Sequence, residues 1–194
     1  MKLLKISNCL KSACSGLVIL VIGCLFVPVH ADQNDPRLED LFKQLHTAPD
    51  QTTGEAITDQ IWAIWREYPA DAEVGELMSA GVQAMTTGRL RRAERIFDAV
   101  ILRAPNFAEG WNKRATVLYF LRQYEKSAED VRQTLLLEPR HFGATAGLGL
   151  IFLSLNYPKS AIEAFEKALE INPHLTGPRM QIKRLRDYLE DDPV

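Results

Sequence analysis

The hydrophobic positions of this chain recur at three- and four-residue spacing, and the whole arrangement returns along the chain at one constant interval. The spacing within each interval predicts amphipathic α-helices. A proline closes each interval, and it would end a helix because proline lacks a backbone N–H and biases its predecessor away from helical torsions. The period falls within the range of roughly 20–50 residues that is typical of repeat arrays. The prolines, Pro105, Pro139 and Pro173, predict three units of two antiparallel helices over 74–107, 108–141 and 142–175.

A column of small residues supports the pairing of helices within each unit. Gly81, Ala115 and Gly149 occupy the same place in successive intervals. Two antiparallel helices approach closely where a small residue lets their side-chain ridges interlock. Larger apolar residues in other columns, such as Phe97 and Phe165, would fill the remaining space. The pattern therefore predicts an all-α solenoid of helix pairs.

Further helices flank these units. Residues 32–73 contain two amphipathic stripes and end near Tyr68-Pro69, and we interpret them as an N-terminal helical pair that could be a degenerate repeat. Residues 176–194 carry Ile182, Leu185 and Leu189 on one stripe and basic residues elsewhere. An array needs a terminal helix with a polar outer face, so this segment is predicted to be a capping helix and tail.

Residues 1–31 have the pattern of an export leader. A basic start precedes an apolar stretch and the small-residue sequence Val29-His30-Ala31, which favours a signal peptide cleaved after Ala31. Two alternatives stay open, namely processing at a lipobox that ends in Cys24 and an uncleaved membrane anchor. All three interpretations place the repeats outside the cytoplasm, and we expect a periplasmic protein.

Charge and cysteine content reduce the range of possible partners and sites. The leader contains three lysines and no acid, so the remaining chain has 20 basic and 25 acidic residues and a net charge of −5. A mildly acidic domain argues against nucleic acid as the main partner. All three cysteines, Cys9, Cys14 and Cys24, lie in the leader. The mature chain is therefore expected to have neither a disulfide framework nor a thiol site.

The segment 161–173, AIEAFEKALEINP, closely resembles the second helix of a tetratricopeptide (TPR) repeat. The middle unit is similar, with Trp111, Tyr124 and Glu138-Pro139, whereas Leu77 replaces the usual aromatic in the first unit and Arg114 replaces the usual leucine in the second. The resemblance covers residues 74–173. It implies a right-handed solenoid that serves as a non-catalytic interaction module, and the whole domain looks like the small exported TPR proteins of proteobacteria.

The resemblance also implies a site, because TPR arrays usually bind partners on the concave side formed by the first helix of each unit. The matching positions of this chain are largely apolar, which favours a protein or peptide ligand. An alternative is that a terminal helix of the chain itself covers the groove. The predicted partner-binding groove consists of Met78, Val82, Met85, Asn112, Thr116, Tyr119, Phe120, Leu150 and Leu153.

Two other binding modes have less support. A TPR clamp for a C-terminal carboxylate would need lysine and asparagine at fixed groove positions, and only Asn112 is present. The basic run Arg89–Arg95 would lie on the convex side, where it could contact anionic phospholipid or an acidic partner. Such a run is more often a solvated helix face.

No pattern in the chain indicates catalysis. His46, His141 and His174 lie in turns or at helix ends without metal-ligand spacing. The glycines at 143, 147 and 149 lack a preceding strand and the phosphate-loop pattern. We therefore expect no enzymatic activity, no cofactor and no metal.

Together these features predict a periplasmic interaction module that holds a peptide or helix of an envelope protein. The alternative is a membrane-associated structural or accessory factor, attached through Cys24 lipidation or the Arg89–Arg95 face, that supports envelope assembly or integrity. The sequence carries no signal for the oligomeric state.

Overall fold

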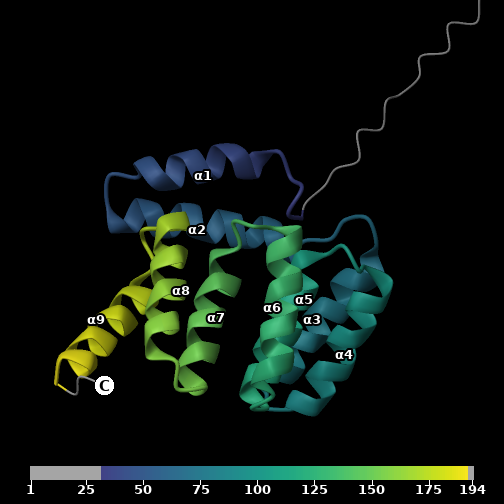
Figure 1. The fold of residues 1–194 in the computed structure, drawn as a ribbon. Coiled ribbons are helices and arrows are strands. Elements are labelled where there is room, and N and C mark those ends of the chain that lie inside the picture. Colours follow the sequence, from purple (N-terminus) through teal and green to yellow (C-terminus); the bar gives the residue numbers. More distant parts are fainter. Residues whose placement is uncertain (1–31, 192–194) are drawn as a thin grey trace, which may run out of the picture.

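The computed structural model describes residues 32–191, which fold into nine α-helices (Figure 1). The expectations for the leader, including Cys24 and the cleavage after Ala31, lie outside these residues. The helices are α1 (Arg37–Thr47), α2 (Gln51–Arg66), α3 (Ala72–Thr86), α4 (Leu90–Arg103), α5 (Ala108–Phe120), α6 (Tyr124–Leu137), α7 (Phe142–Ser154), α8 (Pro158–Ile171) and α9 (Thr176–Asp191).

Three helix pairs, α3–α4, α5–α6 and α7–α8, form the predicted solenoid, and their close approach depends on the small-residue column. A Cβ atom added to Gly81 would lie 2.6 Å from Cε1 of Phe97. A Cβ atom at Gly149 would lie 2.5 Å from Cε1 of Phe165. Each phenylalanine ring thus fills the space that a side chain would need, and both rings are buried.

The turn inside each pair repeats in backbone conformation but not in sequence. Gly88, Arg122 and Asn156, which occupy equivalent positions of the three units, have φ angles of 72°, 58° and 62°. Only the first is a glycine, which adopts this left-handed conformation at no steric cost. Asparagine tolerates it, whereas Arg122 is held there against its preference.

The N-terminal pair lies across the ends of the array. In Figure 1, α1 and α2 cross the upper ends of α8 and α7 and reach α6, rather than standing beside α3. These helices and the segment just before α1 contact each of the three turns that follow the units. Gln33 Nε2 donates to the carbonyl of Asn106 at 2.5 Å, Arg140 pairs with Glu39 at 3.4 Å, and Gln51 Nε2 donates to the carbonyl of His174 at 2.6 Å.

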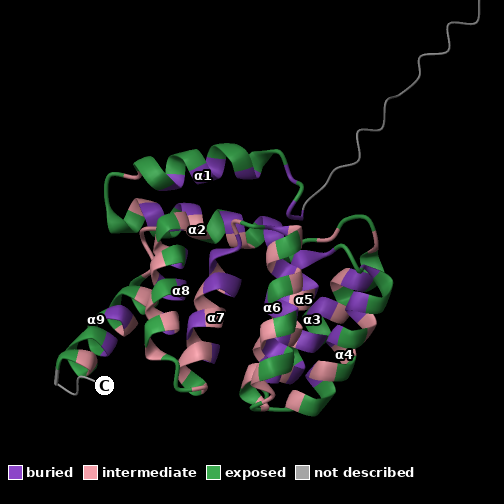
Figure 2. Ribbon diagram, in the orientation of Figure 1, coloured by how far each residue is buried: buried purple, intermediate pink, exposed green. Residues whose placement is uncertain are grey.

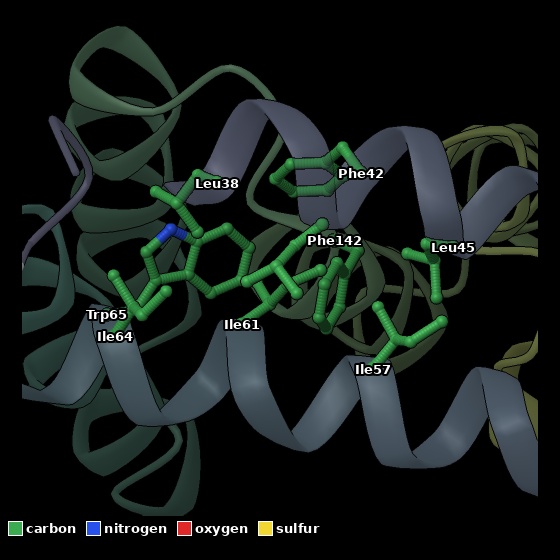
Figure 3. Close-up of a cluster of buried hydrophobic side chains, with 9 residues drawn as sticks. Leu38, Phe42, Leu45, Ile57, Ile61, Ile64, Trp65 and Phe142 are labelled. Atoms are coloured by element: carbon green, nitrogen blue, oxygen red, sulfur yellow. The ribbon is translucent and has the colours of Figure 1, made fainter. Parts of the chain in front are cut away.

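Asn106, Arg140 and His174 are equivalent positions of the repeat, so the pair contacts one periodic edge of the array. The pair has its own core, which Phe142 of α7 enters (Figure 3). It therefore does not occupy the place of a preceding repeat, as a degenerate unit would. An apolar stripe predicts a helix but does not indicate which surface the stripe will cover.

The capping helix α9 covers α8 at the other end. Ile182 and Leu185 of α9 are buried in a cluster with Ala161 and Phe165 of α8. The opposite face of α9 is exposed and mostly charged (Figure 2). Within residues 32–191, none of the helices is both long enough and apolar enough to cross a membrane.

Candidate functional site

A pocket of about 170 Å³ opens between α5, α6 and α7. Its walls are mainly apolar, and Phe120 at its edge is 56% exposed. Asn112 and Ser127 add polar atoms, although both side chains are buried. The residues that line it are Asn112, Ala115, Thr116, Tyr119, Phe120, Ser127, Val131, Gly143, Ala144, Gly147, Leu150 and Ile151.

The pocket exists because α7 carries glycines where α5 carries long side chains. Gly143 and Gly147 correspond in the repeat to Glu109 and Lys113. A Cβ atom at Gly147 would meet no other atom within 4 Å, so this position borders open space. Gly143 is different, because a Cβ atom there would lie 2.5 Å from Cη2 of Trp62 in α2. The N-terminal pair therefore closes one end of the pocket.

The predicted groove residues divide into two groups. Five of them, Asn112, Thr116, Tyr119, Phe120 and Leu150, line this pocket. The other four pack elsewhere. Met78 is buried in the core around α3 and α4, and Val82 and Met85 are partly buried against it. Leu153 packs on the cluster between α8 and α9.

Apart from Trp62 at its closed end, neither end of the described chain covers the pocket. The N-terminal pair rests on the turns between units, and α9 rests on α8. The exposed ring of Phe120 is consistent with an open site. The described residues thus form an opening between the second and third units that contains part of the predicted groove.

A buried polar cluster adjoins the closed end of the pocket. Glu109 accepts hydrogen bonds at Oε2 from Asn112 (2.7 Å) and from Nε2 of His141 (3.1 Å). Nζ of Lys113 lies 2.8 Å from Oε1 of the same carboxylate. The indole of Trp65 stacks on the His141 ring with 4.2 Å between the centroids. Glu109 and His141 are almost completely buried, so this cluster ties α5 to α7 beneath α2.

The charge of Glu109 is stabilised inside the protein. Burial alone would raise its pKa, but the ammonium of Lys113 and the hydrogen bond from His141 outweigh burial and lower the pKa of Glu109 to about 2. Nδ1 of His141 accepts the backbone N–H of Ala144 at 3.0 Å, which caps the N-terminus of α7. Both ring nitrogens are thus engaged and screened from solvent. This arrangement fixes the start of α7 and leaves no face of the imidazole open to a substrate.

The sequence did not indicate this cluster. We expected His141 to be a turn residue, whereas Glu109 occupies a first-helix position that would face the concave side of a TPR array. A useful signal is that Glu109 and Lys113 stand one helical turn apart on a predicted helix that is otherwise poor in charge. In residues 32–191, no group of three or more histidine, aspartate or glutamate side chains is arranged to hold a metal ion.

Comparisons with known proteins agree with this architecture. A family model described as tetratricopeptide repeat matches residues 112–175. The solved TPR domain of Sgt2 from Aspergillus fumigatus has a TM-score of 0.59 at 25% identity and covers 62% of this chain and 82% of its own. The second TPR domain of human RPAP3, in complex with an HSP70 peptide, has a TM-score of 0.54 at 21% identity and covers 57% and 92%.

A curated relative covers more of the chain. The TPR repeat-containing protein of Rhizobium etli is 31% identical over 153 residues, which are 79% of this chain and 74% of the relative. The repeats, the glycine-mediated helix pairs and this extended match together show that the chain belongs to the tetratricopeptide-repeat proteins.

Proposed function

We propose that this protein is a non-catalytic interaction module of the periplasm that binds a peptide or helix of an envelope protein in the pocket between α5 and α7. The observation that carries the proposal is the open, mainly apolar pocket with the exposed Phe120 at its edge. Concave apolar sites with a few placed polar groups are the usual form of a binding site. The TPR fold typically serves as an interaction scaffold, and solved relatives hold peptides.

The chemistry of the pocket favours an apolar ligand side chain over a carboxylate. Asn112 and Lys113, which could bind an anion, are both engaged by Glu109. Neither side chain is therefore free to bind a ligand carboxylate at this end of the pocket. We therefore do not extend the binding of chaperone peptides from the solved relatives to this chain.

The periplasmic location is supported by the leader, residues 1–31, with its basic start and apolar stretch. A mass spectrum of the mature protein tests this part of the proposal. Asp32 at the N-terminus supports cleavage after Ala31, a diacylated Cys24 supports the lipoprotein alternative, and an intact Met1 contradicts both.

A membrane-associated accessory role is the second candidate, and the start of α4 favours it. Arg89, Arg91, Arg92 and Arg95 are all exposed. Among the described residues only Arg91 of this group forms an ion pair, with Glu94. Charge reversal at Arg91 and Arg92 should release the protein from anionic vesicles if this face binds membrane, and should change nothing if the face is only solvated.

Crosslinking in the native envelope tests the interaction itself. Tyr119→Ala combined with Leu150→Ala removes two pocket walls. The matched control, Tyr157→Ala with Leu102→Ala, removes the same side-chain types at positions that are 58% and 86% exposed outside the pocket. We expect the pocket variant alone to lose a partner adduct. An unchanged set of adducts in the pocket variant would refute the site.

A further inference from the structure

A second groove lies on the opposite face of α7, between α6 and α8. Its volume is about 380 Å³, and its floor consists of apolar side chains from all three helices. It shares no residue with the pocket between α5 and α7. The residues that line it are Leu135, Pro139, Thr145, Leu148, Phe152, Ser160, Glu163, Ala164 and Lys167.

The preceding junction of the repeat shows what normally occupies this place. Thr145 is equivalent to Trp111, because one repeat length separates them, as it separates Pro139 from Pro105. The indole N–H of Trp111 donates to the carbonyl of Pro105 at 2.9 Å. The guanidinium of Arg114 lies over the indole ring, 5.0 Å from its centroid. Trp111 is thus held by one polar contact at its edge and one cation over its face.

Two further substitutions open the second junction. Arg114 and Asp130, which form a two-bonded ion pair at 2.7 and 2.8 Å, are replaced by Leu148 and Ala164 at the equivalent positions. The third unit therefore lacks the indole, the cation over it and the anion that holds the cation. What remains at these positions is Thr145, Leu148 and Ala164, which line a mainly apolar groove.

One feature of the indole site remains in the second junction, and a cation is present there at a different position. Pro139 stands where Pro105 stands in the first, and it lines the groove. Lys167 is an exposed cation at the edge of the groove, within reach of a ring that enters it. A cation over an aromatic face is attracted to the ring, most strongly for tryptophan.

We propose that this groove binds the indole side chain of a tryptophan from a partner protein, in the place that Trp111 fills one repeat earlier. The chain has only three tryptophans, so a second copy would have to supply one of them. Trp65 is buried, Trp62 packs on Gly143, His141 and Phe142, and Trp111 is held by Pro105 and Arg114. The indole must therefore come from a different protein, and this contact is independent of the pocket on the other face of α7.

The test uses indole and N-acetyltryptophanamide as probes of the full mature chain, followed by NMR of its leucine methyl groups. We expect saturable shifts at Leu135 and Leu148 and none at Leu150, which lines the other pocket. N-acetylleucinamide is the matched probe and should produce much smaller shifts. Equal shifts with both probes, or shifts confined to Leu150, would overturn the proposal.

Two variants fill the groove from within. Thr145→Trp should abolish the indole-dependent shifts, because the new side chain takes the place of the ligand. Should Thr145→Trp fail to fold, Leu148→Arg with Ala164→Asp rebuilds the ion pair of the preceding unit across the groove. Loss of the shifts in either folded variant supports the site, whereas shifts that persist in a filled groove exclude it.

Discussion

The indole of Trp65 lies flat against the imidazole of His141, with 10° between the two ring planes. This contact joins the N-terminal pair to the start of α7, because His141 also caps that helix. The pair is therefore part of the array's structure at its turns. The neighbouring Trp62 packs on Gly143 and closes one end of the candidate pocket.

Trp65→Ala should be among the most destabilising single substitutions. The side chain is 1% exposed, and truncation of a buried aromatic residue typically costs about 3–5 kcal/mol. We also expect faster hydrogen exchange at the amide of Ala144, which His141 holds. Urea unfolding and exchange NMR provide the measurements. Tyr188→Ala, at a position 54% exposed, is the control, and an equal effect of the two substitutions would contradict the role of Trp65.

Glu109 should make stability depend on pH in the acid range. Its pKa is lowered from 4.5 to about 2, so its stabilisation is complete above about pH 4.5 and is lost as the pH falls towards 2. Glu109→Gln should therefore cost a few kcal/mol at pH 7 and progressively less as the pH falls. The pKa of Glu129 is also lowered to about 2, mainly by its hydrogen bond from Arg132, but Glu129 is exposed.

Solvent screens an exposed pair, so Glu129→Gln should barely change the unfolding free energy at any pH. Urea titrations at several pH values would compare the two variants. Equal pH dependence in both would show that burial of Glu109 does not matter.

Replacing both Arg114 and Asp130 by apolar residues should cost less stability than replacing Arg114 alone. Arg114→Leu leaves Asp130, whose side chain is 4% exposed, buried without its partner, and we expect a loss of about 3 kcal/mol. Adding Asp130→Ala recreates the Leu148 and Ala164 pair of the next unit and should recover most of that loss. Denaturant unfolding of the single and double variants provides the test. A double variant that is less stable than Arg114→Leu would show that the third unit's arrangement does not transfer.

Two glycines of α7 should respond in opposite ways to alanine. Gly149→Ala would press on the ring of Phe165 and should destabilise the protein by roughly 1–3 kcal/mol. Gly147→Ala meets open space and should stabilise it by roughly 0.5–1 kcal/mol, because alanine loses less backbone entropy in a helix. Thermal unfolding would measure both. Effects of the same sign would contradict the packing described for α7.

The sequence predicted the fold well because the apolar, small and proline positions that determine the fold recur at a constant interval. Proline ends each unit, and Gly81 and Gly149 mark the close approach of paired helices, so a single column predicts a packing contact. Arg114 was unexplained in that pattern. The structure shows that its guanidinium bonds to Asp130 of its own unit and to Asp98 of the preceding one. A comparison of equivalent positions does not reveal a contact between different positions of two units.

The candidate site was harder to predict than the fold. Position in the repeat identified Tyr119, Phe120 and Leu150, but the pocket depends equally on Gly143 and Gly147, which contribute space rather than contacts. Residues such as Met78 occupy matching positions yet pack into a core. Whether such a residue lines a pocket or packs into a core depends on the size of the side chains on the neighbouring helix. The position of a residue in its own helix does not reveal that size.

The most direct test of the central claim is site-specific photocrosslinking in the native envelope, with p-benzoylphenylalanine at Phe120 or at Leu102. The first position borders the pocket, and the second is 86% exposed on α4 outside it. We predict a discrete partner adduct from position 120 that disappears when Gly147→Leu fills the pocket and persists with the matched change Gly75→Leu, which also enters open space. An adduct from position 120 that survives Gly147→Leu, or adducts that are the same from both positions, would contradict binding in this pocket.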